Sequence, residues 1–362
     1  MAELYESLGF FDNPFSRYSA EEEQSELEKI FLRPNYFDVV CSNLISGNSR
    51  FIIGDRGTGK TALMLQLKDR IRSEGSIPVI IDRYTDFPIH NNKHKLLISI
   101  IENTVLELCL TTIADKKIVR SLRKETKEKF SLILATFYRG IGKEELAIRL
   151  DSITGYKKWN FIKRLVNGIL NKPLNILING GVNIISDFFR RSMNLPSAIP
   201  EACYREYLPQ FKEKDLTQQI FDAEIVKKDD SLIHILVALK DIAKEIGKNS
   251  IVVFFDKIDE YQVLKNQISS ISSFLEEITT DTSLLQTDNV AFVFVIWSKI
   301  RKKMNELNVR FDKFKAIDVN WQDSDIEEIM EKSKRQYNYI SPSGPGMAMV
   351  DTRRYRHAEN QG

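Results

Sequence analysis

The residues best suited to chemistry lie in one short loop within FIIGDRGTGKTALM, positions 51–64. Its glycines, lysine and threonine match the pattern G-x-x-x-x-G-K-[ST], between an apolar run and a helical pattern. Glycines let successive backbone N–H groups approach phosphate oxygens, and a helix that begins near Lys60 directs the positive end of its dipole at the same anion. The loop therefore predicts a phosphate cradle, made of Gly54, Asp55, Arg56, Gly57, Thr58, Gly59, Lys60, Thr61 and Ala62.

A phosphate cradle needs a metal partner at the end of a neighbouring strand, and the run IVVFFDKIDE supplies an acid there. Asp256 follows the apolar residues and is expected to bind Mg²⁺ or its waters together with the Thr61 hydroxyl, while Lys60 reaches the β- and γ-phosphates. Asp259 and Glu260 come next, and either could orient or deprotonate an attacking water. These motifs predict ATP and Mg²⁺ as ligands and Mg²⁺-dependent ATP hydrolysis as the reaction.

Five apolar runs have the length and composition of strands that would position this loop and its acids. They are residues 49–54, 77–84, 250–256, 289–297 and the weaker run 314–321. The first two enclose the loop and a helical pattern, an order that implies parallel strands. The third and fourth are apolar throughout, as in strands covered on both faces. The sequence therefore predicts an α/β fold, a P-loop NTPase core with a parallel sheet.

The chain is longer than such a core requires, and its patterns divide it further. A helical lead-in is expected at 1–48, and the core at 49–95 and 246–322, interrupted by a large helical insertion at 96–245. A C-terminal helix is expected at 323–340, and the stretch 341–362, rich in glycine and proline at its start, is expected to be disordered.

An apolar stretch inside the insertion, residues 165–189, carries an asparagine at every fourth position from Asn167 to Asn183. On a helix this spacing gives a polar stripe, which argues against a membrane-spanning helix and favours an amphipathic hairpin packed on its neighbours. Its apolar face could also meet an unidentified protein partner, another copy of the chain or, as the less favoured alternative, a membrane surface. The insertion is therefore the expected carrier of partner specificity and of self-association.

Composition and charge bear on two further questions, whether the protein binds nucleic acid and where in the cell it is located. Of the 362 residues, 43% are hydrophobic and 28% are charged, and the formal net charge is +2. Nucleic-acid binding is neither required nor excluded by this charge, and it is not favoured, because the basic run 116–130 alternates with apolar residues as a solvated helix face does. Three scattered cysteines fit no disulfide or zinc pattern, and the acidic N-terminus lacks a signal-peptide core, so the expected location is the cytoplasm.

The two motifs also carry a family resemblance. GDRGTGKT at 54–61 together with VVFFDKIDE at 252–260 resembles the P-loop ATPases of the STAND class, whose NACHT members end the second motif in Asp-Gly-x-Asp-Glu. Lys257 stands where that family usually has a small residue, and AAA+ ATPases proper have a glutamate there. The spacing of Asp256, Asp259 and Glu260 is kept, and by this resemblance Asp259 is slightly favoured over Glu260 as the acid that handles water.

The resemblance extends over residues 8–90 and 250–335 and implies further site residues. LGFFDNPF and IFLRPNYFDVV resemble segments of a group of little-characterised bacterial P-loop ATPases and the lead-in of Orc/Cdc6-like ATPases, which places Asn13, Pro14 and Phe15 beside the adenine. By the same resemblance Ser298, in VIWSKIR, is a sensor that touches the γ-phosphate, and Arg310 is an arginine finger that acts on a neighbouring copy.

The sequence as a whole predicts an ATP-binding and ATP-hydrolysing P-loop ATPase that works as a nucleotide-driven switch. The resemblance points to bacterial stress or phage defence as its setting. Two alternatives stay open. One is a nucleotide-gated scaffold for a protein partner that hydrolyses ATP slowly or not at all, and the other is an ATPase that loads or remodels DNA.

Overall fold

The computed structural model describes residue 20 and residues 24–84, 87–114, 118, 122–137 and 229–337. The chain divides into two units, of which the larger is Asn35–Asn320. The smaller unit joins the two ends of the chain, and its described helices, α2 (Gln24–Ile30) and α16 (Asp323–Tyr337), contact each other. Helix α16 covers most of the helix predicted at 323–340. The predicted tail at 341–362 and the predicted adenine-side residues Asn13, Pro14 and Phe15 lie outside the described residues.

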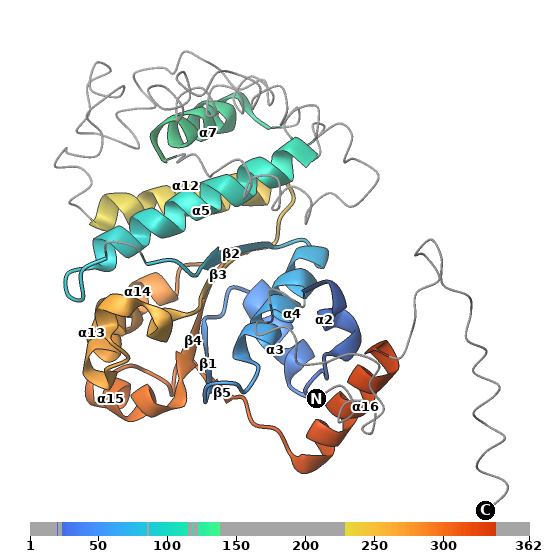
Figure 1. The fold of residues 1–362 in the computed structure, drawn as a ribbon. Coiled ribbons are helices and arrows are strands. Elements are labelled where there is room, and N and C mark those ends of the chain that lie inside the picture. The colour runs from blue at the N-terminus through green and yellow to red at the C-terminus, as the bar shows by residue number, and fades with distance from the viewer. Residues whose placement is uncertain are drawn as a thin grey trace, which may run out of the picture. The chain divides into compact units, whose positions relative to one another are not determined.

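A five-stranded parallel sheet forms the centre of the larger unit (Figure 1). The order across the sheet is β2-β3-β4-β1-β5, and every neighbouring pair is parallel. All five runs predicted to be strands are strands, so the α/β fold with a parallel sheet is confirmed. Their bounds are β1 (Arg50–Gly54), β2 (Ile77–Ile81), β3 (Ile251–Phe255), β4 (Val290–Trp297) and β5 (Ala316–Asp318).

The apolar sequences of β3 and β4 follow from their central position. Every residue of β3 is buried, and in β4 only the last residue, Trp297, is partly exposed. Phenylalanines from three strands stack through the sheet, with Phe294 between Phe51 and Phe255 at centroid distances of 5.2 and 4.9 Å. Such strands need no polar face, because helices cover the sheet on both sides.

The helices form layers around the sheet (Figure 1). One face carries α3 (Phe37–Ile45) and α4 (Lys60–Ser73), and the other carries α13 (Ile268–Thr280), α14 (Thr282–Leu285) and α15 (Arg301–Glu306). Helices α5 (Lys93–Ala114), α7 (Lys124–Phe137) and α12 (Asp229–Glu245) lie along the β2 side. Among the helices described, none is both long enough and apolar enough to cross a membrane.

The predicted insertion at 96–245 is described only at its two ends. Helices α5, α7 and α12 share one hydrophobic core with the sheet, to which Leu97, Phe130 and Leu239 each contribute a fully buried side chain. Residues 138–228, which contain the asparagine-striped stretch, lie outside the described part of the chain. The insertion and its partner surface therefore stay predictions.

The strand order determines which residues meet at the carboxyl edge of the sheet. Strand β4 lies between β1 and β3, and its last residue, Trp297, is in register with Gly54 at the end of β1. In parallel strands all carboxyl ends lie at the same edge, which is where α/β proteins place ligands. The segments that follow β1, β3 and β4 therefore converge there.

Candidate functional site

The loop that joins β1 to α4, residues 54–61 and here called the glycine loop, needs its glycines for two different reasons. Gly57 and Gly59 have φ angles of +79° and +80°, in the left-handed region that side chains disfavour. Gly54 needs space instead, because a Cβ atom there would lie only 2.6 Å from Thr58 Oγ1 and 3.3 Å from Lys60 Cγ. The glycines thus allow a tightly wound backbone.

Hydrogen bonds within the glycine loop converge on one carbonyl group. The carbonyl oxygen of Asp55 accepts from Thr58 Oγ1 at 2.9 Å and from Lys60 Nζ at 2.7 Å. Burial lowers the pKa of Lys60, although the nearby carboxylates of Asp259, Asp256 and Asp55 oppose the shift. The ammonium group of Lys60 therefore lies half-buried across the loop, in the midst of acidic side chains.

The first turn of α4 presents backbone donors at the same place. Helix α4 is 14 residues long, its N-cap is Gly59, and no side chain caps it. The first intrahelical bond runs from Leu63 N–H to Gly59 O, so the N–H groups of Lys60, Thr61 and Ala62 have no acceptor within the helix. A helix N-terminus with donors of this kind attracts anions, and phosphate in particular.

The two predicted metal ligands meet beside this helix end. Thr61 Oγ1 donates to Asp256 Oδ2 at 3.0 Å, although the residues are 195 positions apart. Asp256 is only 4% exposed, and its N–H donates to Ile81 O at 3.0 Å. The buried Tyr84 hydroxyl lies 2.8 Å from the carbonyl oxygens of both Asp256 and Ile81. The aspartate is therefore held between the ends of β2 and β3.

The donor set at this point suits a hard divalent cation. A hydroxyl and a carboxylate are oxygen ligands, and Mg²⁺ is typically held by one or two carboxylates with phosphate and water oxygens completing its shell. Among the described residues no group of three or more His, Cys, Asp or Glu side chains forms a metal site by itself. Thr61 and Asp256 would thus hold Mg²⁺ together with a phosphate ligand.

Arg56 ties the glycine loop to the segment after β3. Its Nε donates to Asp259 Oδ2 at 2.9 Å, and its Nη2 donates to Asn266 Oδ1 at 2.6 Å. Its guanidinium carbon lies 4.9 Å from the ring centroid of Trp297, the last residue of β4. One side chain therefore connects the ends of three strands.

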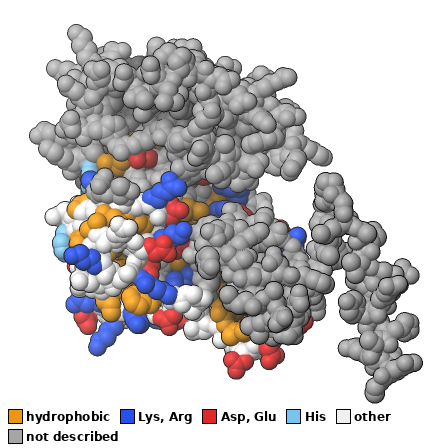
Figure 2. Space-filling view, in the orientation of Figure 1, with side chains coloured by type: hydrophobic (Ala, Val, Ile, Leu, Met, Phe, Trp, Pro, Cys, Tyr) orange, Lys and Arg blue, Asp and Glu red, His pale blue; other side chains and the backbone are white. Residues whose placement is uncertain are grey.

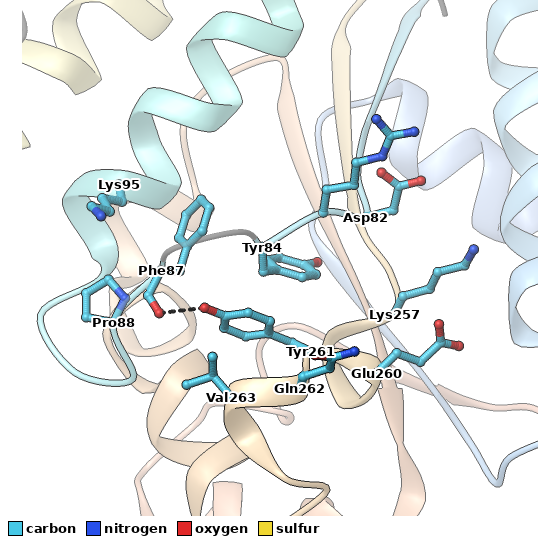
Figure 3. Close-up of a pocket in the computed structure, with 11 residues that line it drawn as sticks. Asp82, Tyr84, Phe87, Pro88, Lys95, Lys257, Glu260, Tyr261, Gln262 and Val263 are labelled. Carbon is cyan, nitrogen blue, oxygen red and sulfur yellow. Dashed lines mark hydrogen bonds between the residues drawn. The ribbon is translucent and has the colours of Figure 1, made fainter.

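The two acids that could act on the attacking water, Asp259 and Glu260, have different surroundings in the structure. Both belong to the short 3₁₀ turn η3 (Ile258–Glu260). Asp259 lies toward the glycine loop, where Arg56 binds it, whereas Glu260 is exposed and lines a pocket with Asp82 and Lys257 (Figure 3). Of the described residues that line this pocket, none belongs to the glycine loop. Asp259 is thus the acid with a direct contact to the loop.

The predicted sensor also reaches the glycine loop. Ser298 begins the 3₁₀ turn η5 (Ser298–Ile300) directly after β4, and its hydroxyl donates to Asp55 Oδ1. The contact follows from the strand order, since β4 is the neighbour of β1. A change in the conformation of the glycine loop at Asp55 would therefore alter the hydrogen bond that Ser298 makes.

Arg310 does not join this network. It is exposed, and its Nε and Nη2 donate to Asp312 at 2.9 and 2.7 Å. The hydrogen bond from Arg310 lowers the pKa of the Asp312 carboxyl to about 2. A finger that acts on another copy of the chain stays a prediction.

Three residues of the site escape sequence reasoning. Trp297 and Tyr84 lie at or just after strand ends, a weak signal, since aromatic residues are common in strands. Asn266 gives no signal, because its partner Arg56 is 210 positions away and its backbone, with φ of +55°, is set by a local turn.

Comparisons with models of known protein families, with curated proteins and with solved structures found no match for this chain.

Proposed function

We propose that this protein is a P-loop ATPase that binds ATP with Mg²⁺, hydrolyses it and works as a nucleotide-driven switch. The observation that carries the proposal is the 3.0 Å contact between Thr61 Oγ1 and Asp256 Oδ2 at the uncapped end of α4. These residues follow two strands that are not neighbours, and a chance glycine turn would not need an acid from β3 beside its threonine.

Each part of the site has a role in this proposal. The N–H groups of Lys60, Thr61 and Ala62 bind phosphate oxygens, and Lys60 Nζ exchanges the Asp55 carbonyl for the β- and γ-phosphates. Bound Mg²⁺ supplies positive charge against the phosphates, and Thr61 and Asp256 orient it. Ser298 hydrogen-bonds Asp55 and so communicates the state of the loop to the end of β4.

Asp259 is the acid that we assign to the attacking water. Its carboxylate is next to the glycine loop, whereas Glu260 lines a pocket to which no described residue of the loop contributes. Asp259 Oδ2 already accepts from Arg56, so one of its oxygens is occupied until that pair opens. Release of Arg56 would therefore free this second oxygen for the attacking water.

The same ion pair favours a second candidate, a nucleotide-gated scaffold with slow or no hydrolysis. If Arg56 stays on Asp259 when ATP is bound, Oδ2 of the acid that we assign to the water stays occupied. Binding would then assemble the site without rapid turnover. The contacts that bind ATP and Mg²⁺ are the same in both candidates, and the rate of phosphate release separates them.

No observation favours the third alternative, an ATPase that acts on DNA. Among the described residues visible in Figure 2, basic and acidic side chains are interspersed rather than separated into a broad patch of one sign. DNA-binding surfaces usually concentrate Lys and Arg on one face.

The decisive experiment compares ATP binding and phosphate release for the wild type, Lys60→Ala, Asp256→Asn and Arg70→Ala. Arg70 is an exposed cation on α4, paired with Glu74 and outside the glycine loop, so its variant is a matched control for Lys60→Ala. We expect Lys60→Ala to lose at least about tenfold in ATP affinity, Asp256→Asn to lose Mg²⁺-dependent turnover, and Arg70→Ala to match the wild type.

Two results would change the proposal. Equal ATP affinity in the wild type and Lys60→Ala would overturn the phosphate site. Tight Mg²⁺-dependent binding with no phosphate release in the wild type would favour the scaffold.

A further inference from the structure

The Tyr84 side chain, in the segment after β2, is held in place by aromatic neighbours. It is only 3% exposed, and its ring meets that of Phe274 on α13 edge to face, with the centroids 5.5 Å apart. Phe87 and Tyr261 also pack around it, at centroid distances of 6.0 and 6.1 Å. Close packing of this kind leaves a side chain few alternative rotamers. The hydroxyl of Tyr84 therefore keeps one position.

This hydroxyl contacts the backbone of the proposed metal ligand Asp256. It lies 2.8 Å from the carbonyl oxygens of both Ile81 and Asp256, and its single hydrogen can go to either of them. The N–H group of Asp256 donates to Ile81 O at 3.0 Å. Lys257, the next residue, has φ of +57°, in the small left-handed region, so the peptide group between Asp256 and Lys257 has little room to rotate. Tyr84 thus helps to fix the backbone from which the Asp256 carboxylate projects.

The carboxylate held in this way has a spacing that suits Mg²⁺. Asp256 Oδ2 and Thr61 Oγ1 are 3.0 Å apart. Mg²⁺ demands near-ideal octahedral geometry with metal–oxygen distances of about 2.0–2.1 Å, which puts neighbouring ligand oxygens roughly 2.9 Å apart. Ca²⁺ takes about six to eight oxygens at about 2.3–2.6 Å in a flexible geometry. A displaced carboxylate would therefore weaken Mg²⁺ binding more than Ca²⁺ binding.

We infer that Tyr84 is a positioning residue for the metal, and that by holding the backbone of Asp256 it makes the site prefer Mg²⁺ to the larger Ca²⁺. This role rests on the proposed function, because the cation in question is the one that accompanies ATP. Removing a group that holds a metal ligand in place commonly weakens metal binding about 10- to 100-fold. Loss of the Tyr84 hydroxyl should therefore act on the part of ATP binding that depends on Mg²⁺.

Tyr261 provides a matched control. Its ring belongs to the same aromatic cluster, and its hydroxyl also donates to a backbone carbonyl, Phe87 O, at 2.9 Å. The hydroxyls of Tyr84 and Tyr261 point in opposite directions (Figure 3). Tyr261→Phe thus removes the same kind of hydrogen bond from the same cluster and keeps the bond to Asp256.

The test measures ATP affinity by calorimetry on the full chain in Mg²⁺, in Ca²⁺ and in EDTA. We expect Tyr84→Phe to lose about tenfold in affinity with Mg²⁺, about threefold or less with Ca²⁺ and less than about twofold with EDTA. Tyr261→Phe should match the wild type in all three conditions. Incorporation of 4-aminophenylalanine at position 84, which keeps a donor at the end of the ring, should restore most of the affinity with Mg²⁺.

Three results would overturn the role of Tyr84. One is wild-type affinity of Tyr84→Phe with Mg²⁺, and another is an equal loss with Mg²⁺ and with EDTA. The third is an equal loss in Tyr261→Phe, which would mean that any hydroxyl of the cluster has the same effect through packing. If circular dichroism shows that Tyr84→Phe does not fold, the wild type decides. ATP binding at least about threefold tighter with Mg²⁺ than with Ca²⁺ supports the role, and equal affinity overturns it.

The wild type also separates the role of Tyr84 from the proposed function. If the wild type binds ATP more tightly with Mg²⁺ than with EDTA and Tyr84→Phe behaves in the same way, the proposed ATPase stands and only the role of Tyr84 fails. If the wild type binds ATP in none of the three conditions, the proposed function fails and the role of Tyr84 fails with it.

Discussion

Single side chains hold the glycine loop against the ends of three strands. Thr61 contacts Asp256 after β3, Asp55 accepts from Ser298 after β4, and Arg56 binds Asp259. All of these partners are on the side where a phosphate ligand would meet the N-terminus of α4. Loss of one contact therefore changes the loop locally, without removing apolar core.

Arg56→Ala is expected to increase ATP turnover, because it releases the Asp259 carboxylate. Arg56 is half-exposed, and an ion pair of this kind is worth about 0.2–1 kcal/mol, so the expected gain in kcat is about 1.4- to 5-fold. Steady-state phosphate release at saturating ATP measures it. The kcat of Arg56→Lys should lie between those of the wild type and Arg56→Ala, because lysine lacks the planar guanidinium that bonds both Asp259 and Asn266. A lower kcat in Arg56→Ala would mean that Arg56 positions Asp259 for water.

Lys257 occupies a backbone conformation that suits glycine better. Its φ of +57° costs a side-chain-bearing residue roughly 1–2 kcal/mol, and glycine avoids this cost while losing about 0.5–1 kcal/mol through a more flexible unfolded chain. Lys257→Gly is therefore expected to unfold within about 1 kcal/mol of the wild type in urea, and Lys257→Val to be less stable than both. A Lys257→Val protein as stable as Lys257→Gly would contradict this expectation.

At the scale of elements, short turns after the strands position the site, and one partly buried helix cap shows how such a turn is held in place. Asp281 caps α14, accepting from the N–H groups of Ser283 and Leu284 at 3.1 and 3.0 Å. Its other oxygen pairs with Lys93 Nζ at 2.9 Å, in the first turn of α5. The cap therefore joins the layer that contains α13 and α14 to the helix on the β2 side.

Stability in acid should depend on Asp281. Burial acts to raise the pKa of its carboxyl, but hydrogen bonds from Ser283, Leu284 and Lys93 outweigh burial and hold it below 3.8. A lowered pKa means that the contribution to stability is fully present above pH 3.8 and is lost as pH falls through the lower folded-state value. Asp281→Asn keeps the cap without the charge, and Asp281→Ala loses both, at a cost of about 1 kcal/mol or more.

Urea unfolding between pH 3 and 7 provides the measurement. The difference in unfolding free energy between wild type and Asp281→Asn should be constant near neutral pH and shrink toward low pH. The Asp281→Ala deficit should retain a part that does not vary with pH. If the unfolding free energies of the wild type and Asp281→Asn differ by the same amount at every pH, the charge of Asp281 does not contribute to stability.

The sheet was predictable from the sequence because its strands are continuous apolar runs. Strands β3 and β4 are covered on both faces, so their pattern cannot be confused with that of a surface strand. The loop and Asp256 were also visible, because both follow such runs directly. The sequence could not predict which of the two acids, Asp259 or Glu260, contacts the glycine loop. It depends on a left-handed residue, Lys257, and on Arg56, whose partners are more than 200 positions away.

At the scale of the whole molecule, the site joins segments that belong to one core. Thr61 is on α4, which packs on β1, β2 and β4, and Asp256 directly follows the fully buried strand β3. A ligand held by both needs the unit Asn35–Asn320 to be folded, because the two segments meet only in the folded unit. Ligand binding should therefore stabilise this unit as a whole.

The final prediction follows from mass action. A ligand at 100 times its dissociation constant that binds only the folded state adds about 2.7 kcal/mol to the unfolding free energy, a rise in Tm of roughly 5–11 °C for a unit of this size. Scanning calorimetry should show this rise for the wild type with Mg²⁺ and ATP and for Asp312→Asn, which removes an exposed carboxylate away from the glycine loop. It should be much smaller with EDTA in place of Mg²⁺, for Lys60→Ala and for Asp256→Asn. A full rise in Asp256→Asn would mean that β3 takes no part in binding, and the contact between Thr61 and Asp256 would then belong to the packing of the loop alone.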